Sequence, residues 1–170
     1  MEGREPVIQY SKSTDYALHA LIHLASTKRR QNVGIKPLST MLGVSESYLS
    51  KIMSKLRQDG IVRAVPGVNG GYELARPADR ITFLEVIQVI EGRQHLFECS
   101  NAESHQHRML AEEGGGGSGK AEQESVRCVC LVKQVMDGAE RQLNQYLQEH
   151  TIQTVLDAAA AAGKIPAHKK

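Results

Sequence analysis

The sequence predicts a mainly α-helical protein, a winged helix-turn-helix with a small two-stranded wing and a long C-terminal helix. Three observations carry this prediction. Between Ser45 and Gly60, apolar side chains recur at helical spacing. A glycine-rich hairpin pattern follows at once in residues 61–75. A second helical pattern, with an apolar seam at heptad spacing, begins near residue 129.

Two shorter helices are expected before that central helix. Apolar residues recur at helical spacing in residues 16–25, and Ser13 is the expected N-cap. Lys12 beside it is a candidate contact to a DNA backbone, because donors near a helix N-terminus suit phosphate; a solvated cap is the equal alternative. Residues 36–43 form the second helix, which has a proline in its first turn and Gly43 at its end.

The third helix carries the candidate residues for reading DNA. Its apolar face repeats at i, i+3, i+4 and i+7 from Leu49, and Ser45 and Gly60 suit its two ends. The opposite face is polar and partly basic, as in a helix that enters a major groove. A helix followed by a hairpin also occurs in small domains that bind no nucleic acid. The short helix and glycine turn that precede it complete the order of a helix-turn-helix and therefore favour DNA binding. The candidate contacts here are Ser45, Ser47, Tyr48, Ser50, Lys51 and Lys55.

The wing is predicted from two short strands, residues 61–65 and 72–75, joined by a turn with several glycines. The glycines permit a tight hairpin that can approach a minor groove. The candidate DNA contacts in the wing are Arg63, Asn69 and Gly70.

After the wing, Thr82 is expected to cap a helix that ends at Gly92. Residues 93–127 have no apolar periodicity and contain the run GGGGSG, so we expect a flexible loop rich in cysteine, histidine and glycine. A helix with a heptad seam follows, and Thr151 caps a last helix. The seam suits a helix that crosses a partner subunit, with packing on its own domain as the alternative. It consists of Val132, Met136, Ala139, Leu143 and Tyr146.

The charge is unevenly distributed along the chain. Residues 1–82 hold twelve Lys and Arg against seven Asp and Glu, a net charge of +5, and residues 83–170 hold nine against twelve, a net charge of −3. The positive field therefore belongs to the half with the helix-turn-helix, which a DNA duplex would attract. No run reaches the roughly eighteen apolar residues of a membrane span, and the first residues lack an apolar signal core. We expect a cytoplasmic protein with no membrane partner.

Three stretches resemble the Rrf-two family of bacterial transcription regulators, which includes the iron-sulfur cluster regulator, the nitric-oxide-sensing repressor and the cysteine-metabolism repressor. They are SKSTDYALHALIHLA, SESYLSKIMSKLRQDGIV and GVNGGYELARPADRITFLEVIQVIEG. The resemblance is close from Tyr10 to about Gly92 and looser beyond. It implies a homodimer that pairs through the long C-terminal helix. Many members carry Arg before the first wing glycine, whereas this chain has Pro66. We therefore expect weak sequence discrimination by the wing, with Arg63 or Arg76 as possible substitutes.

The three cysteines are candidate sensor residues. Cys99 precedes the glycine run, whereas Cys128 and Cys130 follow it near the start of the long helix, where the helix dipole stabilises thiolates. Relatives hold an iron-sulfur cluster with three loop cysteines and a fourth ligand, for which His105 and His107 are candidates. The tight Cys-x-Cys spacing departs from that pattern. A redox-reactive thiol switch, a cluster or other metal, and incidental cysteines all stay open.

These features divide the chain into three predicted parts: residues 1–92, a DNA-binding domain; residues 93–127, a sensor loop; and residues 128–170, the dimerisation helix and the C-terminal helix. The leading hypothesis is a homodimeric, sequence-specific transcription regulator, a repressor, that responds to a redox, metal or small-molecule signal. A winged-helix module for protein contacts alone is disfavoured by the charge of +5. We do not expect an enzyme, because no nucleophile elbow, P-loop or HExxH pattern is present.

Overall fold

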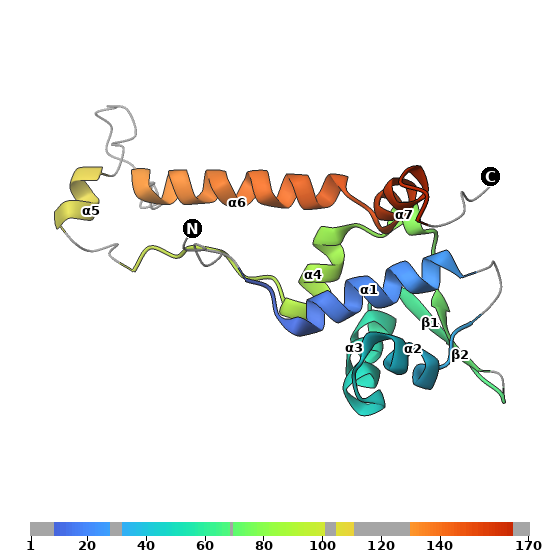
Figure 1. The fold of residues 1–170 in the computed structure, drawn as a ribbon. Helices are drawn as coiled ribbons and strands as arrows, with labels where there is room; N and C mark the ends of the chain where they lie inside the picture. Colours follow the sequence, from blue (N-terminus) through green and yellow to red (C-terminus); the bar gives the residue numbers. More distant parts are fainter. Residues whose placement is uncertain (1–8, 28–31, 69, 101–104, 111–129, 165–170) are drawn as a thin grey trace, which may run out of the picture. The chain divides into compact units, whose positions relative to one another are not determined.

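The computed structural model describes residues 9–27, 32–68, 70–100, 105–110 and 130–164 (Figure 1). It divides into two compact units, one made of Met1–Arg93 and Tyr146–Lys170 and the other of Gln94–Gln145. None of the helices in the described ranges has both the length and the apolar character that a membrane span needs. The first unit contains the predicted winged helix-turn-helix.

Three helices build the core of the first unit. They are α1 (Lys12–Ser26), α2 (Ile35–Leu42) and α3 (Glu46–Gln58). Their apolar faces meet, and Leu21, Leu38 and Leu49, one from each helix, are fully buried. Burial of one leucine side chain contributes about 1.5–3 kcal/mol, so each helix is held mainly by its apolar face. The predicted start of α1 is wrong by two residues, because Ser11 is its N-cap and Ser13 lies within its first turn.

The predicted roles of three residues around α3 are confirmed: Gly43 in the turn before it, Ser45 as its N-cap and Gly60 after its end. Gly43 adopts a left-handed conformation with a φ of 67°, which glycine reaches without the steric cost of a side chain. Ser45 caps α3 by accepting a hydrogen bond from the Tyr48 backbone N–H. Gly60, with a φ of 68°, follows the C-cap Asp59 and turns the chain into the wing.

The wing is an antiparallel pair of β1 (Val62–Val65) and β2 (Gly71–Leu74), with Arg63 opposite Glu73. A third segment joins it, because the backbone groups of Val33 and Tyr72 exchange two hydrogen bonds of 2.9 Å. The wing is therefore attached to the segment that precedes α2.

The two glycines before Tyr72 allow this attachment. A Cβ on Gly71 would lie 2.4 Å from the Val33 carbonyl oxygen, and a Cβ on Gly70 would lie 2.5 Å from that of Val65. Neither has a positive φ, so close approach of backbone requires these glycines.

The first unit is completed by the short 3₁₀ helix η1 (Ala78–Arg80), α4 (Phe83–Glu91) and α7 (Ile152–Ala161). Thr82 caps α4 and Thr151 caps α7, as predicted. The backbone joins the two caps, since Phe83 N–H donates to the His150 carbonyl at 2.9 Å and Ile152 N–H to the Ile81 carbonyl at 2.9 Å. Thus α7 packs with the first unit, whereas the sequence-based division groups it with residues 128–170.

The second unit contains α5 (His105–Leu110) and the larger part of α6 (Leu131–Glu149). The helix α5 lies in the segment that is expected to be a loop, because residues 93–127 lack apolar periodicity; the glycine run lies outside the described residues. No residue of α6 is buried. Within the predicted seam, Val132 is 47% exposed, Tyr146 is 60% exposed and Ala139 is exposed, whereas Met136 and Leu143 are half-buried. Val135, which lies next to the seam, is 72% exposed.

Candidate nucleic-acid interface

The outward face of α3 presents a small set of polar side chains. Ser47 and Lys51 are exposed, Ser50 is half-buried, and Lys12 at the start of α1 is exposed. Within the described part of the chain, the lysine ammonium groups of Lys12 and Lys51 have no hydrogen bond or ion pair. Both ammonium groups are therefore available to phosphate, which binds lysine as a point charge.

Tyr48 lies at the edge of this face and is partly held by α1. Its hydroxyl is 2.8 Å from the Ser13 hydroxyl, and its ring meets the Tyr16 ring edge-on, with centroids 5.9 Å apart. The side chain is still 37% exposed. Ser45 lies at the helix end next to it, with its oxygen already bonded to the Tyr48 N–H and 3.3 Å from the Ser47 hydroxyl.

Lys55 is also exposed, but its ammonium group is engaged within the protein. Its ammonium group donates a 2.9 Å hydrogen bond to the carbonyl of Ile90, near the end of α4. A cation at a helix C-terminus is favourable, because the last carbonyls have no partner within the helix. The structure thus gives this predicted DNA contact a role in joining α3 to α4.

The wing arginines are also engaged by carboxylates. Arg63 Nε donates to Glu73 across the two strands at 2.8 Å, and Arg76 pairs with Glu85 of α4. Arg63 keeps 64% of its side chain exposed, so solvent screens its pair. Gly70 has the close-packing role described above, and Asn69 lies outside the described residues.

Glu91 is an important residue that sequence reasoning missed. One of its carboxylate oxygens accepts hydrogen bonds from the Ser11 N–H at 2.8 Å and from the Thr14 hydroxyl at 2.6 Å. Burial acts to raise the pKa of Glu91, but hydrogen bonds from Thr14 and Ser11 and the charge on Lys55 outweigh it and hold this pKa below its usual range. Burial, followed by the negative charge of Glu91, raises the pKa of Tyr10. The sequence contains one sign of this role. A carboxylate in the last turn of α4 is unfavourable for that helix alone, which indicates a partner elsewhere.

The candidate sensor residues are only partly described. Cys99 is half-buried, Cys130 directly before α6 is buried, and His105 on α5 is exposed. Cys128 and the side chain of His107 lie outside the described residues. In the ranges that are described, no three His, Cys, Asp or Glu side chains come together to hold a metal ion. The described donors therefore do not form a ligand set for a cluster.

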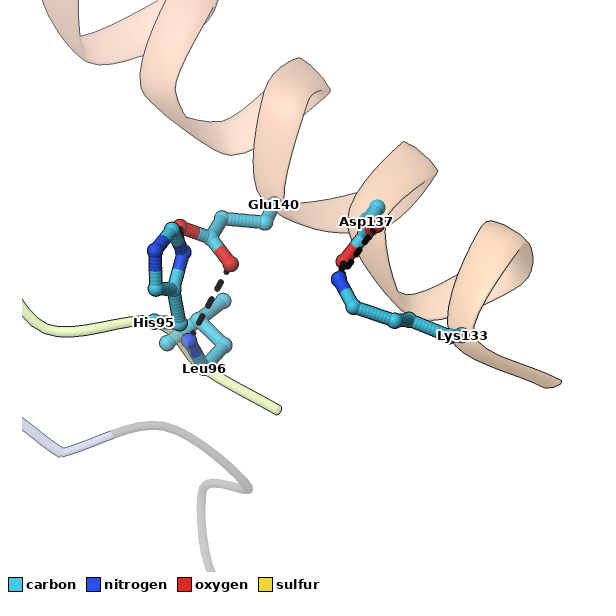
Figure 2. Close-up of polar contacts among 5 residues, drawn as sticks. All are labelled: His95, Leu96, Lys133, Asp137 and Glu140. Carbon is cyan, nitrogen blue, oxygen red and sulfur yellow. Dashed lines mark hydrogen bonds and ion pairs between the residues drawn. The ribbon is translucent and has the colours of Figure 1, made fainter. Parts of the chain in front are cut away.

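The second unit has a polar face on α6 that sequence reasoning also missed (Figure 2). Glu140 accepts the Leu96 backbone N–H at 3.1 Å and lies 3.3 Å from His95 Nδ1, so it attaches the start of the predicted sensor segment to the helix. One turn earlier, Lys133 pairs with Asp137 at 2.7 Å. His95, Lys133, Asp137 and Glu140 are among the residues that line an open pocket of about 240 Å³. Helical spacing of charged residues was the available signal for this face.

Comparison with known proteins agrees with this architecture. Residues 10–158 match the family described as Rrf2, iron-dependent transcriptional regulator. The chain is 29% identical over 150 residues to the protein named "Putative HTH-type transcriptional regulator YffB" of Lactococcus lactis, with 88% of each chain covered. CymR (YrzC), the global cysteine regulator of B. subtilis, has a similar structure, with a TM-score of 0.63, 23% identity, and coverage of 89% of this chain and 98% of that one. For T. potens IscR the TM-score is 0.65 and the identity 22%, covering 96% of this chain and 95% of that one.

The two structural relatives support the fold, and they confirm the predicted winged helix-turn-helix. The family match spans most of the chain and confirms the family that the sequence motifs suggested. The chain belongs to the Rrf2 family, whose members are transcriptional regulators and not enzymes.

Proposed function

We propose that the protein is a homodimeric, sequence-specific DNA-binding repressor whose C-terminal cysteine segment responds to a signal. The observation that carries the DNA-binding part is the outward face of α3, where Ser47 and Lys51 are exposed while the opposite face is buried in the core. A helix presented in this way fits a major groove, and the net charge of +5 on residues 1–82 favours the duplex. A DNA partner supports a cytoplasmic location for the proposed regulator.

The exposed stripe on α6 supports the proposed dimer. Val132, Val135 and Tyr146 keep large apolar areas in solvent on one side of a long helix. Exposed apolar patches of this kind mark interaction sites, and the heptad spacing suits a second copy of the same helix. A two-fold dimer would present two α3 helices to half-sites about 34–36 Å apart. A dimer bound across a promoter would exclude polymerase, which is the simplest route to repression.

The signal is proposed to act at the cysteines. The family description as iron-dependent supports a metal signal, whereas the described donors form no cluster site and leave a redox-reactive thiol as the other candidate. The role of the cysteines is tested by measuring operator affinity for the variants Cys99→Ser, Cys128→Ser and Cys130→Ser. Each variant is measured reduced, oxidised, and after anaerobic reconstitution with iron and sulfide. Equal affinity in every state would exclude the cysteines as the sensor.

The test of the DNA-binding proposal is a titration with a random duplex library, followed by selection of the tightest sequences. We expect saturable binding that weakens steeply with salt, because phosphate contacts release counterions. We also expect enrichment of a two-fold symmetric sequence. A wild-type protein that binds no duplex at low salt would contradict the proposal, and the protein-contact module would then be preferred.

A further inference from the structure

We propose that Glu91 is a positioning residue for DNA recognition, because its carboxylate fixes the first turn of α1 and that turn fixes Tyr48 on α3. This inference rests on the proposed DNA-binding function. It gives Glu91, the second-to-last residue of the ITFLEVIQVIEG motif, a role that its position on α4 does not explain.

The first step is the cap of α1. Ser11 is the N-cap of this helix, yet its side chain makes no capping hydrogen bond. Glu91 of α4 does not replace that bond, but one of its oxygens binds this turn from outside, accepting the Ser11 N–H at 2.8 Å and the Thr14 hydroxyl at 2.6 Å. Thr14 is only 2% exposed, so loss of this acceptor would leave a buried hydroxyl unpaired. A carboxylate at a helix N-terminus is also favoured by the helix dipole. Glu91 therefore holds the first turn of a helix other than its own.

The second step leads from α1 to the recognition helix. Ser13 lies in the turn that Glu91 holds and Tyr16 directly follows it, and both contact Tyr48, one through a 2.8 Å hydroxyl pair and the other through an edge-on ring contact. A displaced first turn would move both partners of Tyr48 at once. The side chain at the edge of the candidate DNA face would then lose its fixed orientation.

A second hydrogen bond from the end of α4 holds α3 directly. Lys55 of α3 donates to the carbonyl of Ile90, the residue before Glu91. Two charged or titratable groups interact electrostatically with Glu91. Lys55 of α3 acts on the Glu91 carboxylate, and Glu91 acts on Tyr10 in the segment before α1. All these residues belong to the first unit.

The test compares Glu91→Leu, which removes acceptor and charge, with Glu91→Gln, which keeps an acceptor. Asp79→Asn, at an exposed position on η1, controls for the loss of one negative charge. The probe is a duplex selected by the wild type, and all affinities are measured where circular dichroism shows each variant to be fully folded. We expect Glu91→Leu to bind about tenfold more weakly, because a Tyr48 side chain that is no longer held must be ordered when DNA binds, and Glu91→Gln to recover most of this loss. Asp79→Asn should stay within about twofold of the wild type.

A double-mutant cycle with Tyr48→Phe separates positioning from general stability. The lost hydroxyl should weaken binding several-fold in the wild type but by less than about twofold in Glu91→Leu, because Tyr48 is no longer held there. Independent effects of the two changes in folded proteins would overturn the inference, as would wild-type affinity of Glu91→Leu.

A measurement without DNA keeps the two proposals distinguishable. In tyrosine-labelled protein, the nuclear Overhauser effect between the rings of Tyr16 and Tyr48 should be strong in the wild type and weak in Glu91→Leu. An unchanged ring contact would overturn the positioning step even where DNA affinity falls. Failure of the wild type to bind any duplex would instead count against the proposed function.

Discussion

Lys51 and Lys55 provide the sharpest comparison, because they are one turn apart on α3 and the sequence predicts both as DNA contacts. Lys51 is exposed without a partner among the described residues, whereas the Lys55 ammonium group donates to the Ile90 carbonyl at 2.9 Å. We therefore expect Lys51→Ala to remove a phosphate contact and Lys55→Ala to remove none.

The magnitude follows from counterion release. Each phosphate contact contributes about 0.9 to the slope of log affinity against log salt, so one contact per protomer of the proposed homodimer contributes about 1.8. Between about 50 mM and about 200 mM salt, the wild-type affinity should fall about 12-fold more than that of Lys51→Ala. Lys55→Ala should keep the wild-type slope. Its free energy of unfolding should fall by about 1 kcal/mol, because the hydrogen bond to the end of α4 is lost.

Fluorescence anisotropy with a selected duplex at several salt concentrations measures the slopes, and thermal unfolding measures stability. In the plot of log affinity against log salt, the slope reports the number of phosphate contacts. A misplaced α3 lowers affinity at every salt concentration and so changes the intercept without changing the slope. A slope that changes equally for Lys51→Ala and Lys55→Ala would refute the reasoning, since Lys55 would then leave α4 on binding DNA.

Three further predictions concern the fold and the dimer. Gly71→Ala should destabilise the wing by about 2–4 kcal/mol, because its Cβ would meet the Val33 carbonyl at 2.4 Å; Gly34→Ala, with ordinary contacts, is the control in urea unfolding. Val135→Glu, at a 72% exposed position, should leave the monomer folded and shift sedimentation from dimer to monomer; an unchanged dimer would move the interface elsewhere. Since the folded pKa of Glu91 is lowered, its stabilisation is present above the usual carboxyl range and is lost as pH falls through the folded pKa. Melting temperatures of wild type and Glu91→Gln should therefore converge in acid, and parallel curves would contradict this.

Local signals in the sequence predicted most of the fold, whereas roles that depend on distant neighbours could not be predicted. The ends of α3 and the wing follow from capping residues and from periodicity within a few residues. Lys55 was assigned to DNA because helical spacing gives the direction of a side chain but not the helix that lies opposite it. Gly71 was explained by hairpin flexibility, while its real constraint is the backbone of Val33, far away in the sequence. Glu91 was missed because the turn that it binds belongs to another helix, far away in the sequence.

These contacts bear on how the protein would select its DNA. Among the predicted contacts on α3, Lys55 is tied to α4 and Tyr48 is partly held by α1, whereas Ser47 and Lys51 are exposed without a contact to another helix. A serine and a lysine distinguish bases poorly compared with the bidentate pairs that arginine, asparagine and glutamine form. We therefore expect the proposed dimer to derive much of its specificity from the spacing of its half-sites and from DNA shape. Insertion of about half a helical turn between selected half-sites should then weaken binding more than any single base change within them.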